Sequence, residues 1–318
     1  MEKYSIGIDI GGTNTDIGLV RNDGKVVSRQ NLPTQAYMDV ATYLNDIISS
    51  ITTLLQNANV KAIEGVGIDA PNANYYTGCI EANTANFTIK EQIPLKAIME
   101  QRLHVPVVVS NDANAAAYGE LVYGAAKGMK HFIMFTLGTG VGSGIVVDGK
   151  LVHGSTGTAG ELGHSILIPE GRLCSCGRRG CIEMYASARG ICQTCLELMQ
   201  ETTDYKGILS PYTKETLTSR LIGEAANAGD PIAIKVYEKT GYWLGIAMAN
   251  AVTFSAPEAI FLMGGPAKAG EVLMKPLRQS FEEHLLMIYE GKVKIMLSQL
   301  NDNDAAILGA AALLKNQE

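Results

Sequence analysis

The sequence has 318 residues, 47% of them hydrophobic and 18% charged, and is therefore long enough for two ordinary domains or one large bilobed unit with a substantial core. Its formal net charge is −6, from 26 basic and 32 acidic residues, and no run of Lys or Arg is long enough to neutralise many phosphates, which argues against nucleic acid as a partner. Residues 1–30 carry charges throughout and lack the apolar core of a signal peptide, and the longest apolar stretch, 242–263, is interrupted by Asn250, Pro257 and Glu258, so we expect a cytoplasmic protein without a membrane span.

A strand, a glycine-rich turn and a hairpin are predicted at the start of the chain. Residues 4–10, YSIGIDI, form an apolar run with β-branched residues, and GGTN, TDIGLVR, the turn pair Asp23-Gly24 and KVVSR follow. The pattern begins again at 131–137, HFIMFTL, which GTG, VGSGIVV, the turn pair Asp148-Gly149 and KLVHG follow. The repeat predicts a three-stranded meander in each half of the chain.

Mixed helices and strands are predicted after each meander. Two copies of a strand-rich α/β unit predict two lobes built on duplicated βββαβα units, with a cleft between them. We place a small lobe over 1–115 and a large lobe over 116–303, and we expect the C-terminal helix, 304–318, to pack on the small lobe. The predicted elements are helix 38–57, strand 64–69, helix 94–103, strand 105–110 and helix 113–125, then helices 183–200, 215–228 and 231–254, strand 259–263, helix 270–286, strand 292–297 and helix 304–315.

The two glycine-rich turns are candidate phosphate sites. Without a Cβ, glycine lets backbone N–H groups approach a phosphate closely, and threonine hydroxyls add further donors. One such turn alone would be read as an ordinary tight β-turn, but its repetition at matching positions favours a pair of turns that hold a polyphosphate. The residues concerned are Gly11, Gly12, Thr13 and Asn14 in the first turn and Thr136, Gly138, Thr139 and Gly140 in the second.

Acidic residues at strand ends supply the predicted phosphoryl-transfer chemistry. Asp9 ends the first strand and is placed to hold a hydrated Mg²⁺, which a kinase needs to neutralise charge on the transferred group. Asn111 and Asp112 follow the strand VPVVVS and begin a helix, where such residues also serve as N-caps. Because ligands of open α/β folds bind beyond the carboxyl ends of strands, Asp112 is our candidate catalytic base.

Four residues within GELGHSILIPEGRLCSCGRRGCIE have the ligand types of a zinc site. One imidazole and three thiolates suit tetrahedral Zn²⁺, and four protein ligands predict a structural metal, although buried free thiols are the alternative. The remaining cysteines, Cys79, Cys192 and Cys195, lack such neighbours in the sequence. The candidate ligands are His164, Cys174, Cys176 and Cys181.

Two carboxylates, Glu161 and Glu183, bracket the candidate zinc ligands. A pair of acceptors suits bidentate recognition of vicinal sugar hydroxyls. Each of the two could equally be a solvated surface acid.

The segments DIGGT, LGTGVGSG, NDANAAAYGE, GTAGELGH and CSCGRRGCIEMYAS together resemble the ROK family, which contains bacterial glucokinases, N-acetylhexosamine kinases, fructokinases and sugar-responsive repressors. The resemblance runs from Gly7 to the closing AAILGAAALL. It implies an actin-like, ribonuclease H-like ATPase fold, an ATP-dependent sugar kinase that phosphorylates the 6-hydroxyl of a hexose, and ATP, Mg²⁺ and structural Zn²⁺ as cofactors. It also implies a homodimer or a dimer of dimers.

The resemblance assigns roles to single positions. Asp112 corresponds to the family's catalytic base, and His164 to a residue that both ligates zinc and orients the sugar. Gly264 and Gly265, after the strand AIFLM, resemble the glycine pair near the adenosine. The implied sugar contacts are Asn86, Asn111, Asp112, Glu161, His164 and Glu183.

Some positions depart from the common family pattern. Asn14 stands where many members have Lys after GGT, DAPNANYYTG lacks the usual Pro-Gly-Pro, and Ile89 stands near the place of a family Trp. Most of these changes concern the sugar side. Glucose is the default substrate, with an N-acetylhexosamine such as N-acetylmannosamine or N-acetylglucosamine, or fructose, mannose or allose, as alternatives.

Two other classes of protein share part of this pattern. A sugar-sensing repressor needs a helix-turn-helix before the first meander, and the first predicted strand begins at about Tyr4. An actin-like assembly or chaperone ATPase needs the phosphate turns but has no use for the E-x-G-H and cysteine motifs. The sequence therefore favours the kinase.

Overall fold

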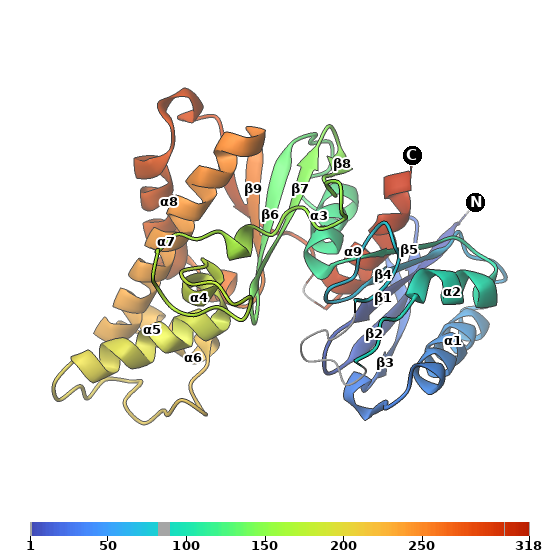
Figure 1. Cartoon of the computed structure of the whole chain (residues 1–318), viewed down its shortest axis with the longest axis horizontal. Helices are drawn as coiled ribbons and strands as arrows, with labels where there is room; N and C mark the ends of the chain where they lie inside the picture. Colours follow the sequence, from blue (N-terminus) through green and yellow to red (C-terminus); the bar gives the residue numbers. More distant parts are fainter. Residues whose placement is uncertain (1, 82–89, 302, 318) are drawn as a thin grey trace. The chain divides into compact units, whose positions relative to one another are not determined.

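The computed structural model describes residues 2–81, 90–301 and 303–317, and the chain divides into two compact units (Figure 1). The first comprises residues 1–130, 144–160 and 298–318, and the second comprises 131–143 and 161–297. The first unit thus extends past the expected boundary between residues 115 and 116. Strand β7 (Val141–Val147) begins in the second unit and ends in the first.

The first unit is built on a five-stranded sheet of order β3-β2-β1-β4-β5. The first three strands form the antiparallel meander that the glycine turn and the Asp23-Gly24 turn predict, while β4 and β5 run parallel to β1. The strands are β1 (Tyr4–Ile10), β2 (Thr15–Arg21), β3 (Val26–Leu32), β4 (Val66–Asp69) and β5 (Val107–Ser110).

One face of this sheet is covered by α1 (Val40–Asn57) and α2 (Leu95–Leu103). Asp39 starts α1 by accepting the Thr42 N–H at 2.8 Å, a standard N-cap. Ile6 and Ile8, at alternate positions of β1, are fully buried with apolar side chains of α1. Because side chains alternate across a strand, the odd-numbered residues of β1 face the other side of the sheet.

Helix α9 (Ala305–Ala312), continued by the 3₁₀ turn η5 (Leu313–Gln317), covers that other face. A Cβ at Gly67 would lie 1.9 Å from the carbonyl oxygen of Ala310, so only glycine allows the helix to approach this closely. Helix α3 (Asp112–Tyr123) packs on α9, where a Cβ at Gly119 would lie 2.9 Å from the Cα of Gly309. This contact places the whole of α3 in the first unit.

The second sheet has the strand order β10-β9-β6-β7-β8, with β9 parallel to both β6 and β10. Its strands are β6 (Phe132–Leu137), β7, β8 (Lys150–Leu151), β9 (Ala259–Met263) and β10 (Lys294–Leu297). The helices of the second unit are α4 (Glu183–Ala186), α5 (Ala188–Glu201), α6 (Ser219–Asn227), α7 (Pro231–Ser255) and α8 (Glu271–His284), with 3₁₀ turns at Leu162–His164 (η2), Pro266–Ala269 (η3) and Met287–Tyr289 (η4). A further 3₁₀ turn, η1, spans Thr34–Ala36 in the first unit.

Two elements of the second half differ from the sequence prediction. The helix expected over 183–200 is interrupted at Ser187, whose extended backbone and side chain cap α5 by accepting the Gly190 N–H at 3.1 Å. The third strand of the second meander is only the two residues of β8, because Gly154 follows with a positive φ of 69°.

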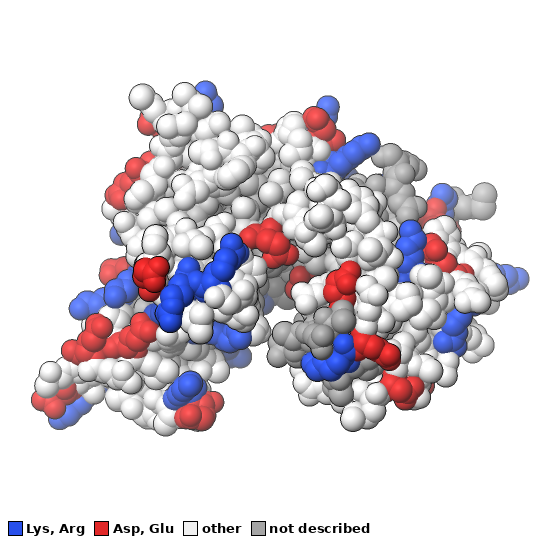
Figure 2. Space-filling model, viewed as in Figure 1, with Lys and Arg blue, Asp and Glu red and all other residues white. Residues whose placement is uncertain are grey.

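Charged side chains of both signs are interspersed on the face shown in Figure 2. Several form ion pairs, for example Lys3 with Glu64 at 2.6 Å and Arg172 with Glu197. Among the helices of the described residues, none combines the length and the apolar character that crossing a membrane requires.

Candidate active site and metal centre

Three carboxylates occupy the carboxyl ends of the parallel strands in the first unit. Asp9 of β1 and Asp69 of β4 are directly paired in register, and Asp112 begins α3 after β5. Asn111 is the N-cap of α3, accepting the Asn114 N–H at 2.8 Å. The N-cap role that the sequence left open for this pair therefore falls to Asn111, and the Asp112 side chain is not needed as the cap.

The pKa of each of these three carboxyl groups is raised. Burial is the main cause for Asp69, whose pKa lies well above its usual range, and the negative charges of Asp9 and Asp112 add to it. Burial also raises the pKa of Asp9, with contributions from the charges of Asp112 and Asp16, although a hydrogen bond with Asp69 acts in the opposite direction.

Asp112 combines an accessible side chain with a raised pKa. Its side chain is exposed, but the protein around it desolvates the carboxylate enough to raise the pKa, while the Ala113 N–H, 2.9 Å from Oδ1, partly opposes this effect. Asp112 thus meets two requirements of a catalytic base, contact with substrate and a pKa above that of a free carboxylate.

Asp69 is the one member of this cluster that the sequence analysis did not single out. It ends the strand VGID, so its position beyond a parallel strand is the same signal that identified Asp9 and Asp112. Strand 64–69 was recognised, but its last residue was not examined as a ligand.

The first phosphate turn, between β1 and β2, is closed by the Gly11 N–H, which donates to the Asn14 carbonyl at 2.9 Å. Thr13 and Asn14 are exposed at its tip. Thr15, directly after the turn, is buried and hydrogen-bonded to Thr34 and Tyr43, which fixes the base of the turn while its tip remains accessible.

The second glycine-rich turn, the other candidate phosphate site, lies between β6 and β7 in the second unit and is closed by a backbone hydrogen bond of shorter sequence span. The Gly138 N–H donates to the Gly140 carbonyl at 3.0 Å, and the Ala188 N–H at the start of α5 donates to the Gly138 carbonyl at 2.9 Å. Arg189 donates from Nε to the Thr139 carbonyl at 2.9 Å. The turn is thus tied to α5.

Gly264 and Gly265, the predicted adenosine-side pair, lie beside this turn. A Cβ at Gly264 would lie 2.1 Å from the carbonyl oxygen of Leu137, the last residue of β6, and the backbone there has φ +106°. Thr136, half-buried on β6, pairs with Met263 of β9. The second unit therefore brings its predicted nucleotide residues together at one end of the sheet.

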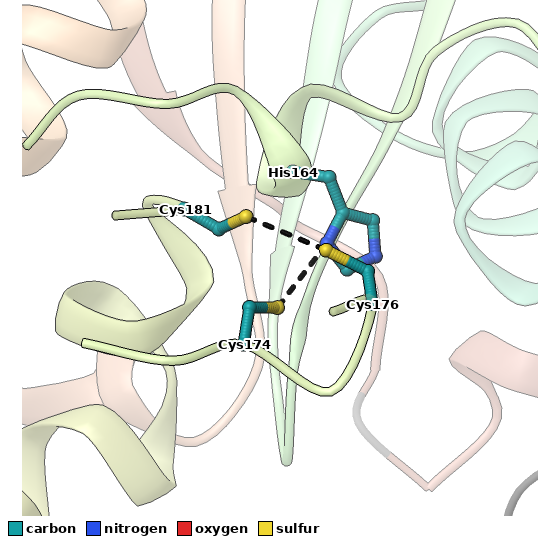
Figure 3. Close-up of side chains that lie close together, drawn as sticks. All are labelled: His164, Cys174, Cys176 and Cys181. Carbon is teal, nitrogen blue, oxygen red and sulfur yellow. Dashed lines mark hydrogen bonds between the residues drawn. The ribbon is translucent and has the colours of Figure 1, made fainter. Parts of the chain in front are cut away.

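His164 and three cysteines converge in the second unit (Figure 3). His164 comes from η2 and the cysteines from the loop that follows, and their four ligand atoms all lie within 4.8 Å of one another. His164 Nδ1 is 3.6 Å from Cys174 Sγ, and the sulfurs of Cys176 and Cys181 are also 3.6 Å apart. A tetrahedron with metal–ligand bonds of about 2.0–2.3 Å has edges of about 3.3–3.8 Å, which the two 3.6 Å separations match, and one imidazole with three thiols is a donor set that suits zinc.

The thiols of this cluster have different environments. The backbone N–H of Arg178 is the main cause that lowers the pKa of exposed Cys176 to about 6, which favours the thiolate that a metal binds. Burial raises the pKa of Cys181 to about 12. A dication at the centre would offset that burial, because it stabilises every thiolate around it.

Glu183 connects the metal loop to the second phosphate turn. Its buried carboxylate accepts the Val141 N–H at 3.1 Å through Oε2, and Cys174 Sγ lies 3.8 Å from Oε1. Glu161 is exposed, with its Oε2 4.0 Å from His164 Nε2, the ring nitrogen that faces away from Cys174. Glu161, His164 and Glu183 therefore lie around one cluster, as predicted from their spacing.

Arg172 is a supporting residue that the sequence analysis missed. Its guanidinium donates to the carbonyls of Met184 and Gly190, at 2.6 and 3.2 Å, and lies 4.7 Å from the centre of the Tyr185 ring. It thereby fastens the cysteine loop to α4 and α5. No sequence motif distinguishes it from the neighbouring arginines. Asn86, the remaining predicted sugar contact, lies outside the described residues.

Comparison with known proteins gives matches over the whole chain. A sequence model of the ROK family matches residues 5–317. A glucokinase of Halalkalibacterium halodurans is 35% identical over 100% of this chain and 96% of its own length, and a glucokinase of Thermotoga maritima is 34% identical over 98% of this chain and 97% of its own.

Solved structures agree with the sequence match. The crystal structure of a ROK family glucokinase from Streptomyces griseus in complex with glucose and AMPPNP is 33% identical, has a TM-score of 0.79 and matches 98% of both chains. The duplicated units built around strands β1 and β6 are those of the actin-like ATPase fold. The family model, the full-length relatives and the fold all agree with the sequence motifs. The chain therefore belongs to the ROK family.

Proposed function

We propose that the chain is an ATP-dependent glucokinase, which transfers the γ-phosphoryl group of ATP to the 6-hydroxyl of glucose. One observation carries the proposal: an accessible Asp112 with a raised pKa stands at a strand end in a chain that is 33–35% identical to glucokinases over nearly its full length. The Streptomyces griseus relative binds both glucose and an ATP analogue, which supports the same two ligands here.

Asp112 acts as the general base. Its carboxylate accepts the proton of the 6-hydroxyl as that oxygen attacks the γ-phosphorus, and its raised pKa makes it a stronger base than an ordinary aspartate. The Ala113 N–H, 2.9 Å from Oδ1, orients the carboxylate and leaves its other oxygen available. Asn86, Asn111, Glu161, His164 and Glu183 hold the sugar hydroxyls, since carboxylates and amides suit that recognition.

Backbone N–H groups of the two glycine turns hold the phosphates of ATP, with Thr13 and Thr139 adding hydroxyl donors. Both turns have exposed tips and a fixed base, which preorganises them for a polyanion. Mg²⁺ bound with the nucleotide neutralises charge on the phosphates, and Asp9 at the end of β1 is the residue that holds it. Gly264 and Gly265 lie on the adenosine side of the second turn, where Gly264 allows close packing on the Leu137 backbone and Gly265 leaves open space for the ligand.

His164, Cys174, Cys176 and Cys181 hold a structural zinc ion. These four residues would fill a tetrahedral shell, so the ion would supply rigidity to the loop that carries Glu183 and to the His164 ring. With Nδ1 as the ligand, His164 keeps Nε2 for the sugar or for Glu161, whose carboxylate lies 4.0 Å from it.

Replacing Asp112 by asparagine tests this assignment. Asparagine keeps the Oδ1 acceptor for the Ala113 N–H and the shape of the side chain, but it cannot take a proton. We expect glucose 6-phosphate formation to fall by about 10²- to 10⁴-fold, the usual contribution of a positioned base. Glucose binding, measured by calorimetry, should change by less than about threefold, which is under 0.7 kcal/mol.

Asp148→Asn is the matched control, because Asp148 is exposed in a hairpin turn at φ +51°, a conformation that asparagine also tolerates. It should have the wild-type rate. A rate for Asp112→Asn within about tenfold of the wild type would remove Asp112 as the base, since a factor of that size is below the usual contribution of one.

A further inference from the structure

The divalent cation that accompanies ATP has a second protein ligand in this chain. We propose that Asp69 coordinates that cation through Oδ1, beside Asp9. The inference rests on the proposed ATP-dependent function for the presence of the cation, and on the geometry of β1 and β4 for the ligand.

Asp9 and Asp69 are neighbours by register. They are directly paired at the ends of two parallel strands, and adjacent strands lie about 4.8 Å apart, with paired side chains on the same face of the sheet. Their carboxyl groups interact with each other. In an octahedral shell with bonds of about 2.0–2.1 Å, two adjacent ligand oxygens are separated by about 2.9 Å. Paired carboxylates on adjacent strands can approach this separation, so the two side chains can act as neighbouring ligands of one Mg²⁺.

The second observation is an acceptor oxygen without a partner. Asp69 is 2% exposed, and its Oδ1 has no hydrogen-bond partner within the described part of the chain. Ser110, the register partner of Asp69 on β5, and Asn114 on α3 also have buried side-chain oxygens without partners there. A buried carboxylate oxygen that no donor satisfies destabilises the folded state unless a ligand or ion binds it.

A purely structural role does not account for this arrangement. An acid that only stabilised the fold would have its oxygens satisfied by backbone or side-chain donors, as Asp39 and Asp230 do at the N-termini of α1 and α7. Asp69 instead adds negative charge next to Asp9 and Asp112, whose charges contribute to raising its pKa. A bound cation would stabilise that accumulation of charge.

The test measures how much Mg²⁺ strengthens nucleotide binding. The dissociation constant of AMPPNP is determined by calorimetry with excess Mg²⁺ and again with EDTA, for the wild type, Asp69→Asn and Asp16→Asn, without sugar and without turnover. Asp16→Asn is the matched control. Asp16 pairs with Asp9 from β2, the neighbouring strand on the side opposite β4, so its substitution also removes one negative charge next to Asp9. Asp16 differs from Asp69 because it is partly exposed and accepts a hydrogen bond from Asn31 at 2.9 Å. Zinc content and near-ultraviolet circular dichroism confirm that each variant is folded.

If Asp69 is a ligand, Mg²⁺ strengthens AMPPNP binding about 10- to 100-fold less in Asp69→Asn than in the wild type, while the value in EDTA is unchanged or improved. Asp16→Asn should remain within about threefold of the wild type, which corresponds to under 0.7 kcal/mol. An unchanged Mg²⁺ effect in Asp69→Asn, or an equal loss in both variants, would overturn the ligand role while leaving the kinase proposal intact. A wild type that does not bind AMPPNP under either condition would overturn the ATP site together with Asp69's part in it.

Discussion

Replacing Cys176 by serine removes one proposed zinc ligand with little loss of packing. Cys176 is exposed, whereas Cys174 and Cys181 are buried, so substitutions of the latter two would mix metal loss with a cavity. Serine keeps the size of the side chain but is a poor ligand for zinc, which prefers thiolate. We expect the variant to lose zinc during dialysis against a weak chelator and the wild type to retain it.

The size of the effect follows from the loop that the metal closes. The proposed zinc ion would link His164 to Cys181, so without it the segment between them would gain chain entropy in the unfolded state, as a cross-linked loop does when its link is cut. For a loop of about 18 residues the loop-closure relation gives about 3 kcal/mol. In a unit of this size, a change of that magnitude lowers Tm by about 6–12 °C.

Zinc is measured by mass spectrometry, Tm by calorimetry and the glucose KM by ADP release. The KM should rise, because His164 and the loop before Glu183 lose their fixed positions. Cys79→Ser is the control, since Cys79 lies outside the cluster and is only partly buried. Wild-type zinc content with an unchanged Tm in Cys176→Ser would refute the structural zinc site.

Three further outcomes follow from the site. Glu183→Gln should raise the glucose KM more than tenfold and lower the free energy of unfolding by about 1 kcal/mol, because a neutral acceptor replaces the carboxylate that binds the Val141 N–H; an unchanged KM would exclude Glu183 from the sugar site. Gly163→Ala should displace η2 and weaken glucose binding, since its Cβ would lie 1.8 Å from the Val141 carbonyl oxygen, and calorimetry showing wild-type affinity would contradict this geometry. Asp112 must be ionised to act as the base, and burial raises its pKa. The kcat/KM should therefore fall as the pH is lowered, with a midpoint above pH 3.8, the ordinary pKa of an aspartate. A profile that stays flat down to pH 3.8 would contradict the desolvation of Asp112.

Local signals account for the features that the sequence predicted well. The Asp-Gly pairs and the glycine turns specify hairpins through backbone preferences of a few adjacent residues, so the repeat that begins at Tyr4 and His131 could be recognised without any tertiary information. The clustering of the four candidate zinc ligands is predictable for the same reason, because three of the four lie within one short loop. Asp112 was identified from its place between a strand and a helix.

Features that depend on distant pairing were missed. The role of Asp69 follows from its register with Asp9, a pairing between segments about 60 residues apart that no local pattern encodes. The extent of the first unit depends on the contact of Gly119 with Gly309, which joins α3 to the C-terminal helix. The helix break at Ser187, by contrast, was within reach, because serine before a helical run is a common N-cap.

The central claim is tested most directly by ADP release with Mg·ATP, measured by a coupled assay across glucose, mannose, fructose, allose and the N-acetylhexosamines. We expect a sugar-dependent rate with the highest kcat/KM for glucose, from protein whose zinc content is confirmed. No stimulation by any of these sugars, with the protein folded and zinc present, would contradict the assignment of the chain as a glucokinase.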